Sequence, residues 1–599
     1  MKAFTEPLLS LAGFEEMTKT VEKSSGLISV TGCIDAQKSQ MIYAFGGHRK
    51  NKLIVTFGEQ KAKELYDEYS FFDKEVVYYP SKDVLFYQSD IRGNLLTAER
   101  IRALKAIREQ ERVTLVTTFD ALMNTMAPIE KMWENVLTLE LGQLLDLKEI
   151  QAALIRMGYE KEYQVQTMGQ FSVRGGILDV FPLTEENPIR IELWGDEIDT
   201  IRYFDCESQK SIENIDRVSI YPAAELVLSD EEKAGGIDKL KAEAKRVSDK
   251  LRKQMKTEEA HRVTVMADEL TEEWGELSMY AGMDAFLSYF FDERVGILDY
   301  FNPSDSLIFF DELTRCVEQG KLTETEFSES MKQRLAMGYI LPGQMNGLFT
   351  EKEIVAKLGK YSCIALAALD NKANGLHQLG SYGIHCQSVS PYNNSFELLI
   401  KDLKRYKKNG YRVILLSGSR TRAKRLSEDI TDQGITCFYT ENYDHELSEG
   451  QIMVCYGKVR RGFEYPILKF AVITESDIFG AQQKKKKRHR TYEGEKIQSF
   501  TDLSVGDYVV HENHGLGIYR GIEKLEVDKK VKDYIKIEYQ GGSNLYILAT
   551  QLDMIQKYAG KDARKPKLNK LGGQEWTRTK NRVRGAVKQI AGDLSLIHI

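Results

Sequence analysis

Apolar and polar residues alternate most regularly between residues 168 and 205. The apolar positions of this alternation are Phe171, Val173, Ile177, Val180, Ile189, Ile191 and Leu193. A period of two that is rich in β-branched residues is typical of antiparallel strands with one buried face. Gly175-Gly176 and Asn187-Pro188 interrupt the pattern and mark turns between the strands. We therefore expect an antiparallel β domain in this part of the chain.

The opposite face of these predicted strands carries large cationic and aromatic side chains, namely Arg174, Arg190, Trp194 and Arg202. Arginine and tryptophan are enriched among the residues that anchor protein interfaces. A solvated strand face with a packed tryptophan would produce the same pattern. The residues by themselves leave both interpretations open.

A second pattern, in which buried strands alternate with helices, fills the N-terminal part of the chain. Apolar runs at residues 27–30, 53–57, 76–79 and 114–117 are separated by helical patterns such as residues 98–108. This β-α alternation predicts a parallel sheet that is covered by helices.

The first of these strands leads into an altered phosphate-binding loop. Gly32, a short loop, Lys38-Ser39 and a helical run reproduce the frame of a P-loop. However, Gln37 stands where the pattern has glycine, and Asp35 puts a carboxylate into the loop. Such a loop points backbone N–H groups at phosphate, which requires glycine's conformational freedom. We expect a degenerate, non-functional site, with residual ATP binding as the alternative.

Two acidic residues follow a further apolar strand at residues 308–310. This strand with Asp311 and Glu312 is similar to a Walker B strand, whose aspartate would hold magnesium. Because the phosphate loop is altered, we expect these acids to have no catalytic role. An acidic pair after a strand is also a common helix start.

Residues 350–480 are predicted to form a small α/β domain. Strands are expected at residues 413–416, 437–439, 453–456 and 470–474, with an amphipathic helix at residues 419–430. No catalytic constellation is recognisable there. The basic run at residues 484–490 favours a solvated linker, with phosphate or RNA contact as the alternative.

Short strands and turns are densest between residues 501 and 558. Gly506-Asp507 and Gly541-Gly542 mark turns, and residues 534–539 alternate in polarity. This spacing predicts a small β-barrel. His511 and His514 lack the nearby cysteines or acids of a zinc site, so we expect them to be structural.

Composition restricts the possible functions. The chain has 599 residues, enough for about four domains. Its net charge of -6 limits any DNA contact to a local surface. The seven cysteines form no CxxC pair, which predicts reduced thiols and no metal site. No apolar run reaches bilayer length and no signal peptide is recognisable, so we expect a cytoplasmic protein without a membrane partner.

The alternating stretch also carries long motifs. GQFSVRGGILDVFP at residues 169–182, PIRIELWGDEIDTIRYFD at residues 188–205 and SQKS at residues 208–211 resemble the excinuclease-A-binding domain. That domain is shared by excinuclease B and the bacterial transcription-repair coupling factors. The resemblance implies that Arg174, Arg190 and Trp194 contact excinuclease A. The family often has phenylalanine at the position of Trp194.

The predicted barrel has its own resemblance. GDYVVH at residues 506–511, HGLG at 514–517, LEV at 525–527 and DYIKIEY at 533–539 are similar to the RNA-polymerase-interacting domain of the same factors and to the CarD family. The resemblance implies that strand 522–527 docks on the RNA polymerase β subunit. Leu525 would be the apolar contact, flanked by Lys524 and Glu526, and strand addition would supply affinity. Alternatively, Leu525 is an ordinary barrel residue.

The remaining segments resemble other parts of these proteins. The order of motifs in the first lobe is similar to excinuclease B, but residues 80–97 hold only Phe86 and Tyr87 where that protein has a long aromatic hairpin. Independent damage recognition is therefore not expected. PKLNKLGGQEW at residues 566–576, which includes Trp576, matches the connector to a translocase motor. The motor, which would use ATP and magnesium on double-stranded DNA, is expected to lie outside this chain, and residues 595–599 suggest a truncated end.

These observations predict a multidomain α/β and β protein: a degenerate helicase-like parallel lobe with an inserted antiparallel domain, a small α/β domain and a small Tudor/CarD-like barrel. The expected divisions are residues 1–120, excinuclease-B-like domain 1A; 121–217, excinuclease-A-binding domain; 218–349, domain 1B; 350–480, third domain; 481–497, basic linker; 498–560, polymerase-interacting barrel; and 561–599, connector and start of the translocase.

The function implied by the resemblance is that of an adaptor in transcription-coupled nucleotide excision repair. It would bind RNA polymerase stalled at lesions and recruit excinuclease A. This chain itself is expected to need no cofactor and to lack ATPase activity. The alternatives are an ATP-binding relative of excinuclease B and a CarD-like transcription regulator with an unrelated front half.

Overall fold

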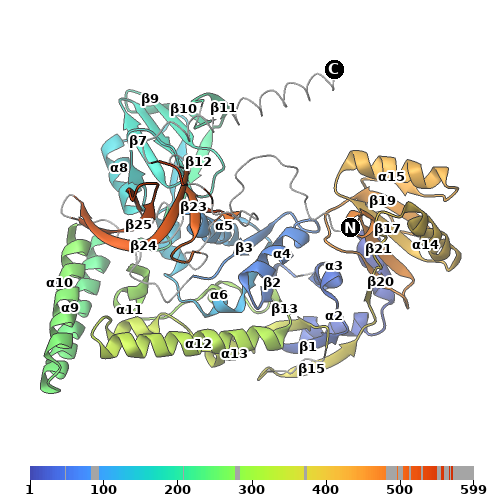
Figure 1. The fold of residues 1–599 in the computed structure, drawn as a ribbon, viewed down its shortest axis with the longest axis horizontal. Helices are drawn as coiled ribbons and strands as arrows, with labels where there is room; N and C mark the ends of the chain where they lie inside the picture. Colours follow the sequence, from blue (N-terminus) through green and yellow to red (C-terminus); the bar gives the residue numbers. More distant parts are fainter. Residues whose placement is uncertain are drawn as a thin grey trace.

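The computed structural model has several α/β and β units with a projecting helical hairpin (Figure 1). It describes residues 1–46, 49–82, 94–206, 208–276, 283–369, 374–479, 495–496, 503–511, 515–527, 530–548, 555–558, 566 and 568–570.

The first unit is built on a seven-stranded, fully parallel sheet. Its strands, in spatial order, are β15 (Gln378–Gly383), β1 (Gly26–Thr31), β14 (Ser362–Leu366), β13 (Ser306–Asp311), β2 (Asn51–Thr56), β4 (Val113–Thr118) and β3 (Val76–Tyr79). The central strands are buried at nearly every position because both faces of the sheet are covered. This parallel sheet confirms the prediction from the β-α alternation.

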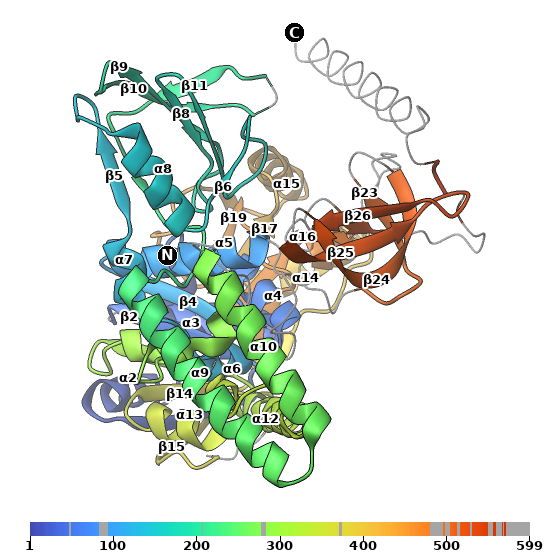
Figure 2. The ribbon, with the colours of Figure 1, turned by 90° about the vertical axis from the view of Figure 1, so that its left-hand side faces the viewer.

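Helices cover the two faces of this sheet. One face packs on α2 (Phe14–Lys23), α3 (Asp35–Gly46) and α4 (Glu59–Tyr69). The other packs on α5 (Asn94–Glu109), α6 (Phe119–Met123), α12 (Leu313–Ala336) and α13 (Glu351–Leu358). A helical hairpin, α9 (Asp230–Lys253) and α10 (Thr257–Glu276), projects from this side (Figures 1 and 2).

The first sheet extends further along the chain than the sequence suggested. We placed the start of the third domain at residue 350, but β14 and β15 pair with β1 in the first sheet. The chain joins the next sheet only after Gly383. Apolar periodicity identifies a buried strand but does not determine which sheet it joins.

The inserted unit contains a six-stranded sheet with one helix, α8 (Leu147–Arg156), on its apolar face. The order of strands is β11 (Ser211–Asn214), β10 (Glu197–Phe204), β9 (Ile189–Trp194), β8 (Ile177–Val180), β7 (Gln170–Arg174) and β6 (Glu160–Lys161). All neighbours are antiparallel except β6 and β7. The predicted alternation is confirmed for Phe171, Val180, Ile189 and Ile191, which are fully buried. It is wrong for Ile177, which pairs with Arg174 and Glu192 on the opposite face, while Leu178 takes the buried position.

A two-stranded ribbon of β5 (Leu137–Glu140) and β12 (Arg217–Ile220) joins the insertion to the first unit. The predicted insertion began at residue 121. However, Met126, Ile129 and Met132, around α7 (Ile129–Glu134), lie in the core of the first unit. The antiparallel unit therefore begins at the ribbon.

The third unit has the strand order β16 (Gln387–Ser388), β20 (Phe463–Tyr465), β21 (Phe470–Thr474), β17 (Arg412–Ser417), β19 (Ile452–Tyr456) and β18 (Phe438–Tyr439). Its helices α14 (Phe396–Lys408) and α15 (Arg420–Asp432) cover one face. The other face shares a core with the first unit, where Ile414 and Met453 belong to the same cluster as Phe4 and Phe71. The two units are therefore one packed body (Figure 1).

The C-terminal unit is an antiparallel sheet set apart from this body (Figure 2). Its order is β22 (Glu495–Lys496), β27 (Ile555–Lys557), β23 (Tyr508–His511), β24 (Gly515–Val527), β25 (Lys530–Glu538) and β26 (Asn544–Leu548). Val509, Tyr519 and Ile537 lie in its core. Closure of this sheet into a barrel stays a prediction. No helix in the described part of the chain has both the length and the hydrophobicity to cross a membrane.

Candidate functional site

The backbone of the altered phosphate loop is bonded to neighbouring protein carbonyls. The N–H of Gly32 donates to the carbonyl of Ala368 at 3.3 Å, and the N–H of Cys33 donates to that of Ala367 at 2.9 Å. Gly32 has a φ of +78°, and a Cβ there would lie 2.0 Å from the carbonyl oxygen of Ile384. Two amides at the start of the loop are thus already occupied, because the loop packs closely against the segments that follow β14 and β15.

Lys38 is enclosed by carboxylates. Its Nζ lies 2.5 Å from Asp311 Oδ1, 2.9 Å from Glu312 Oε1 and 3.0 Å from Asp35 Oδ1. Its side chain is only 1% exposed. Burial favours the neutral amine, but the attraction of these carboxylates outweighs it and raises the pKa of Lys38. An ammonium has three donors, so each one has a carboxylate partner.

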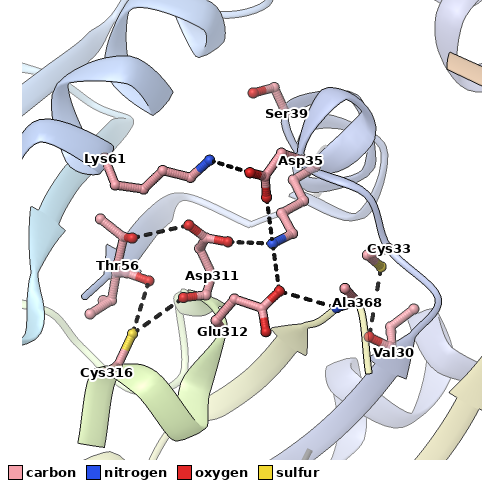
Figure 3. A network of polar contacts seen from close by, with 12 residues as sticks. Val30, Cys33, Asp35, Ser39, Thr56, Lys61, Asp311, Glu312, Cys316 and Ala368 are labelled. Carbon is pink, nitrogen blue, oxygen red and sulfur yellow. Dashed lines mark hydrogen bonds and ion pairs between the residues drawn. The ribbon is translucent and has the colours of Figure 1, made fainter. Parts of the chain in front are cut away.

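The surrounding side chains hold this cluster in place. Thr56 Oγ1 donates to Asp311 Oδ2 at 3.0 Å, and the N–H of Ala368 donates to Glu312 Oε1 at 3.1 Å (Figure 3). Burial disfavours ionisation of Asp35, but Lys38 and Lys61 outweigh it and lower the pKa of Asp35 to about 2. The cluster ties α3 to β13 as a network of ion pairs.

Gln37 and Ser39 also face the protein interior. Gln37 is fully buried, so its side chain fills space at the junction of loop and helix. Ser39 Oγ donates to Glu68 Oε2 at 3.4 Å, and the N–H of Arg460 donates to Glu68 Oε1 at 3.0 Å. Burial raises the pKa of Glu68 to about 7. A phosphate group at this position would meet several carboxylates, which is unfavourable for an anion.

The insertion brings two of its predicted contact residues onto one carboxylate. Asp179 lies opposite Arg190 across β8 and β9. Arg190 Nε lies 2.7 Å from Asp179 Oδ1, and Arg190 Nη2 lies 2.9 Å from Asp179 Oδ2. Arg174 Nη2 reaches Asp179 Oδ2 at 2.7 Å. Asp179 was not among the predicted contact residues, because Ile177, two residues before it, was expected on the apolar face. The strand pairing puts both residues on the face of the arginines.

The third predicted contact residue lies at the end of the same strand. Trp194 is the last residue of β9 and is 84% exposed, so it is not the packed tryptophan of the alternative interpretation. Arg202 on β10 is engaged in an ion pair with Glu192. The face therefore presents a network of arginines and carboxylates with an exposed aromatic side chain at its edge.

In the C-terminal unit, the predicted contact strand is only partly paired. Residues 515–518 of β24 pair with β23, and the strand shifts register between Tyr519 and Ile522. Beyond this shift, Lys524, Leu525 and Glu526 pair with β25 alone within the described residues. One backbone edge of residues 522–527 is thus without a strand partner in the described part of the sheet.

His511 on β23 is buried. Among the described residues, no group of three or more histidine, cysteine, aspartate or glutamate side chains could hold a metal ion. Several predictions lie outside the described residues, namely those on Phe86, Tyr87, residues 484–490, His514, Trp576 and residues 595–599.

Comparison with known proteins identifies two domains. Residues 137–226 match the family model described as the UvrB interaction domain. Residues 503–559 match the model described as the CarD-like/TRCF RID domain. The fold and these matches define a multidomain α/β protein that combines a UvrB-type interaction domain with a CarD-like domain.

Proteins named transcription-repair-coupling factor are similar to nearly the whole chain. The Bacillus subtilis (strain 168) protein is 32% identical over 544 residues, which cover 90% of this chain and 46% of the relative. The Staphylococcus haemolyticus protein is 30% identical over 583 residues, or 95% and 48%. Over the matched length, the chain is therefore similar to the transcription-repair-coupling factors. It spans about half the length of the curated relatives it matches.

Proposed function

We propose that this chain is an adaptor of transcription-coupled nucleotide excision repair. It binds RNA polymerase stalled at a DNA lesion through the C-terminal unit and recruits excinuclease A through the insertion. The observation that carries this proposal is the presence of both interaction domains in one chain, at residues 137–226 and 503–559.

The polymerase contact uses the second half of β24. The backbone edge of residues 522–527 that lacks a strand partner in the described sheet is suited to pair with a strand of the polymerase β subunit. Main-chain hydrogen bonds would supply affinity. Leu525 would supply the apolar contact, with Lys524 and Glu526 on either side.

The excinuclease contact uses the outer face of the insertion. Trp194 supplies a large exposed apolar surface, and Arg174 and Arg190 supply charged hydrogen-bond donors. Such combinations are typical of interface anchors.

Nucleotide chemistry is not part of the proposal for this chain. Lys38 and the loop amides are engaged by protein groups, which supports a structural role for the altered loop. ATP-dependent translocation on double-stranded DNA, with ATP and magnesium as cofactors, would belong to further residues of a longer protein.

A two-partner binding experiment tests the proposal. The purified chain is immobilised and exposed separately to RNA polymerase and excinuclease A. Leu525→Arg should abolish polymerase binding and preserve excinuclease binding, because it places a charge in the apolar contact. Arg190→Ala should weaken excinuclease binding and leave polymerase binding unchanged, because it removes a charged donor from the excinuclease contact. Arg520→Ala and Arg217→Ala, which remove ion-paired arginines with exposed side chains from β24 and β12, are the matched controls.

The outcomes separate the competing functions. Polymerase binding without any excinuclease binding would favour a CarD-like regulator. ATP turnover above background that Lys38→Ala removes would favour an ATP-binding relative of excinuclease B. Retention of the polymerase complex by Leu525→Arg would remove Leu525 from the contact.

A further inference from the structure

The guanidinium of Arg190 is held by several neighbouring groups of the insertion. Asp179 accepts two of its N–H groups, through Nε at 2.7 Å and Nη2 at 2.9 Å. Gln209 Oε1 accepts the second hydrogen of Nη2 at 2.8 Å. The guanidinium carbon also lies 4.3 Å from the centre of the Phe204 ring. These contacts fix both the plane and the rotation of the arginine.

An arginine has five N–H donors, and three of them are used by these contacts. The two hydrogens of Nη1 have no acceptor among the described residues. The Nε–Nη2 edge, which pairs with a carboxylate in a fork geometry, is already taken by Asp179. A partner can therefore reach this arginine only at its Nη1 end.

The groups that hold Arg190 are themselves held firmly. Asp179 is 1% exposed and also binds Arg174, so its carboxylate is neutralised by two arginines. Gln209 has a φ of +57°, a conformation that residues other than glycine seldom adopt. Its N–H donates to the carbonyl of Asp205, and its Nε2 donates to that of Cys206, both at 2.8 Å. The glutamine is thus locked with its oxygen directed at Arg190.

We propose that Asp179 and Gln209 are positioning residues that preorganise Arg190 for excinuclease A. Arg190 then recognises a single oxygen acceptor, a carboxylate oxygen or a main-chain carbonyl, through Nη1. It does not form a two-pronged pair with a partner carboxylate. This inference rests on the proposed function and specifies the chemistry of its excinuclease contact.

A preorganised arginine binds more tightly because less conformational freedom is lost on association. Gln209→Ala removes one acceptor at a half-buried position and should weaken excinuclease binding roughly tenfold. Asp179→Asn should weaken it further, because it replaces a bidentate charged partner. Arg190→Lys should bind as weakly as Arg190→Ala, since an ammonium cannot reproduce the fork.

A double-mutant cycle distinguishes positioning from general support. Dissociation constants for excinuclease A are measured for Gln209→Ala and Asp179→Asn, each alone and combined with Arg190→Ala. If the two residues act through Arg190, Gln209→Ala should have little further effect in the Arg190→Ala background. Asp179→Asn should keep only the part of its effect that passes through Arg174, which the same carboxylate also binds. In a Trp194→Ala background, their full effect should persist. Thermal unfolding of each variant identifies loss of folding, and Gln209→Ala decides the question if Asp179→Asn fails to fold.

The experiment distinguishes failure of the proposed excinuclease contact from failure of the positioning inference. If Arg190→Ala binds excinuclease A as well as the wild type does, the proposed contact itself is wrong. If Arg190→Ala loses binding while a folded Gln209→Ala and a folded Asp179→Asn retain it, the positioning inference alone is overturned. Equal losses with and without Arg190 would also overturn it.

Discussion

Lys38 and Arg190 are both cations held by carboxylates, yet the two sites differ in what remains available. Lys38 is 1% exposed, and its three donors face Asp35, Asp311 and Glu312. Arg190 is held by Asp179 and Gln209, and both hydrogens of its Nη1 lack an acceptor among the residues that the structure describes. Ion pairs with carboxylates thus occupy every donor of Lys38, whereas at Arg190 they fix the orientation of the side chain. The number of donors on the cation and its burial decide whether a donor remains for a partner.

The largest effect is expected from the removal of Lys38, the cation whose donors are all engaged. Lys38→Ala would leave Asp311 buried beside Glu312 and Asp35 without their common counter-ion. We expect the free energy of unfolding to fall by about 3–5 kcal/mol, as for other broken buried pairs. Urea unfolding followed by tryptophan fluorescence measures this change. Lys61→Ala, which removes a partner of the exposed Asp35 carboxylate, should cost less than about 1 kcal/mol. Equal effects of both variants would contradict a closed, structural cluster.

A second test uses the pH dependence of the neighbouring Glu68. Its folded-state pKa is raised to about 7, so the folded protein retains a proton that the unfolded chain releases above pH 4.5. The resulting stabilisation is complete below pH 4.5 and is lost as the pH rises through 7. Glu68→Gln should therefore become more stable than the wild type above pH 7, by on the order of 2 kcal/mol.

Unfolding midpoints measured from pH 4 to pH 8 check this sign. Asp35 supplies an internal contrast, because its pKa is lowered to about 2. Its stabilisation is present above pH 4 and is lost only as the pH falls toward 2. A Glu68→Gln protein whose stability changes with pH as steeply as that of the wild type between pH 4.5 and 7 would show that Glu68 does not titrate there.

The smallest change in the free energy of unfolding is expected for Trp194, on the proposed excinuclease-binding face. Trp194 is 84% exposed, so Trp194→Ala should alter the free energy of unfolding by no more than about 0.5 kcal/mol. The same substitution should weaken excinuclease binding by roughly 30-fold or more if the side chain is an anchor. Trp194→Phe, which keeps an aromatic ring, should lose less. Unchanged binding by a folded Trp194→Ala protein would exclude the tryptophan from the contact.

Much of the architecture was predictable because it depends on local periodicity. The period of two between Phe171 and Leu193 predicted the antiparallel insertion, and the β-α alternation predicted the parallel sheet. Sheet membership was not predictable for β14 and β15, since a buried strand has the same pattern in either sheet. The shared core of the first and third units was also missed, because it joins Phe4 and Phe71 to Ile414 and Met453 across most of the chain.

The candidate sites divide in the same way. Periodicity placed Arg174, Arg190 and Trp194 on one predicted face, and the substitution of glycine by Gln37 indicated a damaged loop. The role of Asp179 was not evident from the sequence, because the arginines that it binds lie on β7 and β9, and the sequence does not show that these strands neighbour β8.

The sequence alone determined the types of strand and helix, the loss of the loop glycine and the motifs of two interaction domains. Only the tertiary structure decided that the donors of Lys38 are all engaged, while Nη1 of Arg190 meets no acceptor in the described part of the chain. The physical reason is that saturation of a donor depends on partners distant in the chain, such as Asp311, which lies 273 residues from Lys38. Residue type determines how many hydrogen bonds a side chain can make, and folding determines how many of them remain for a partner.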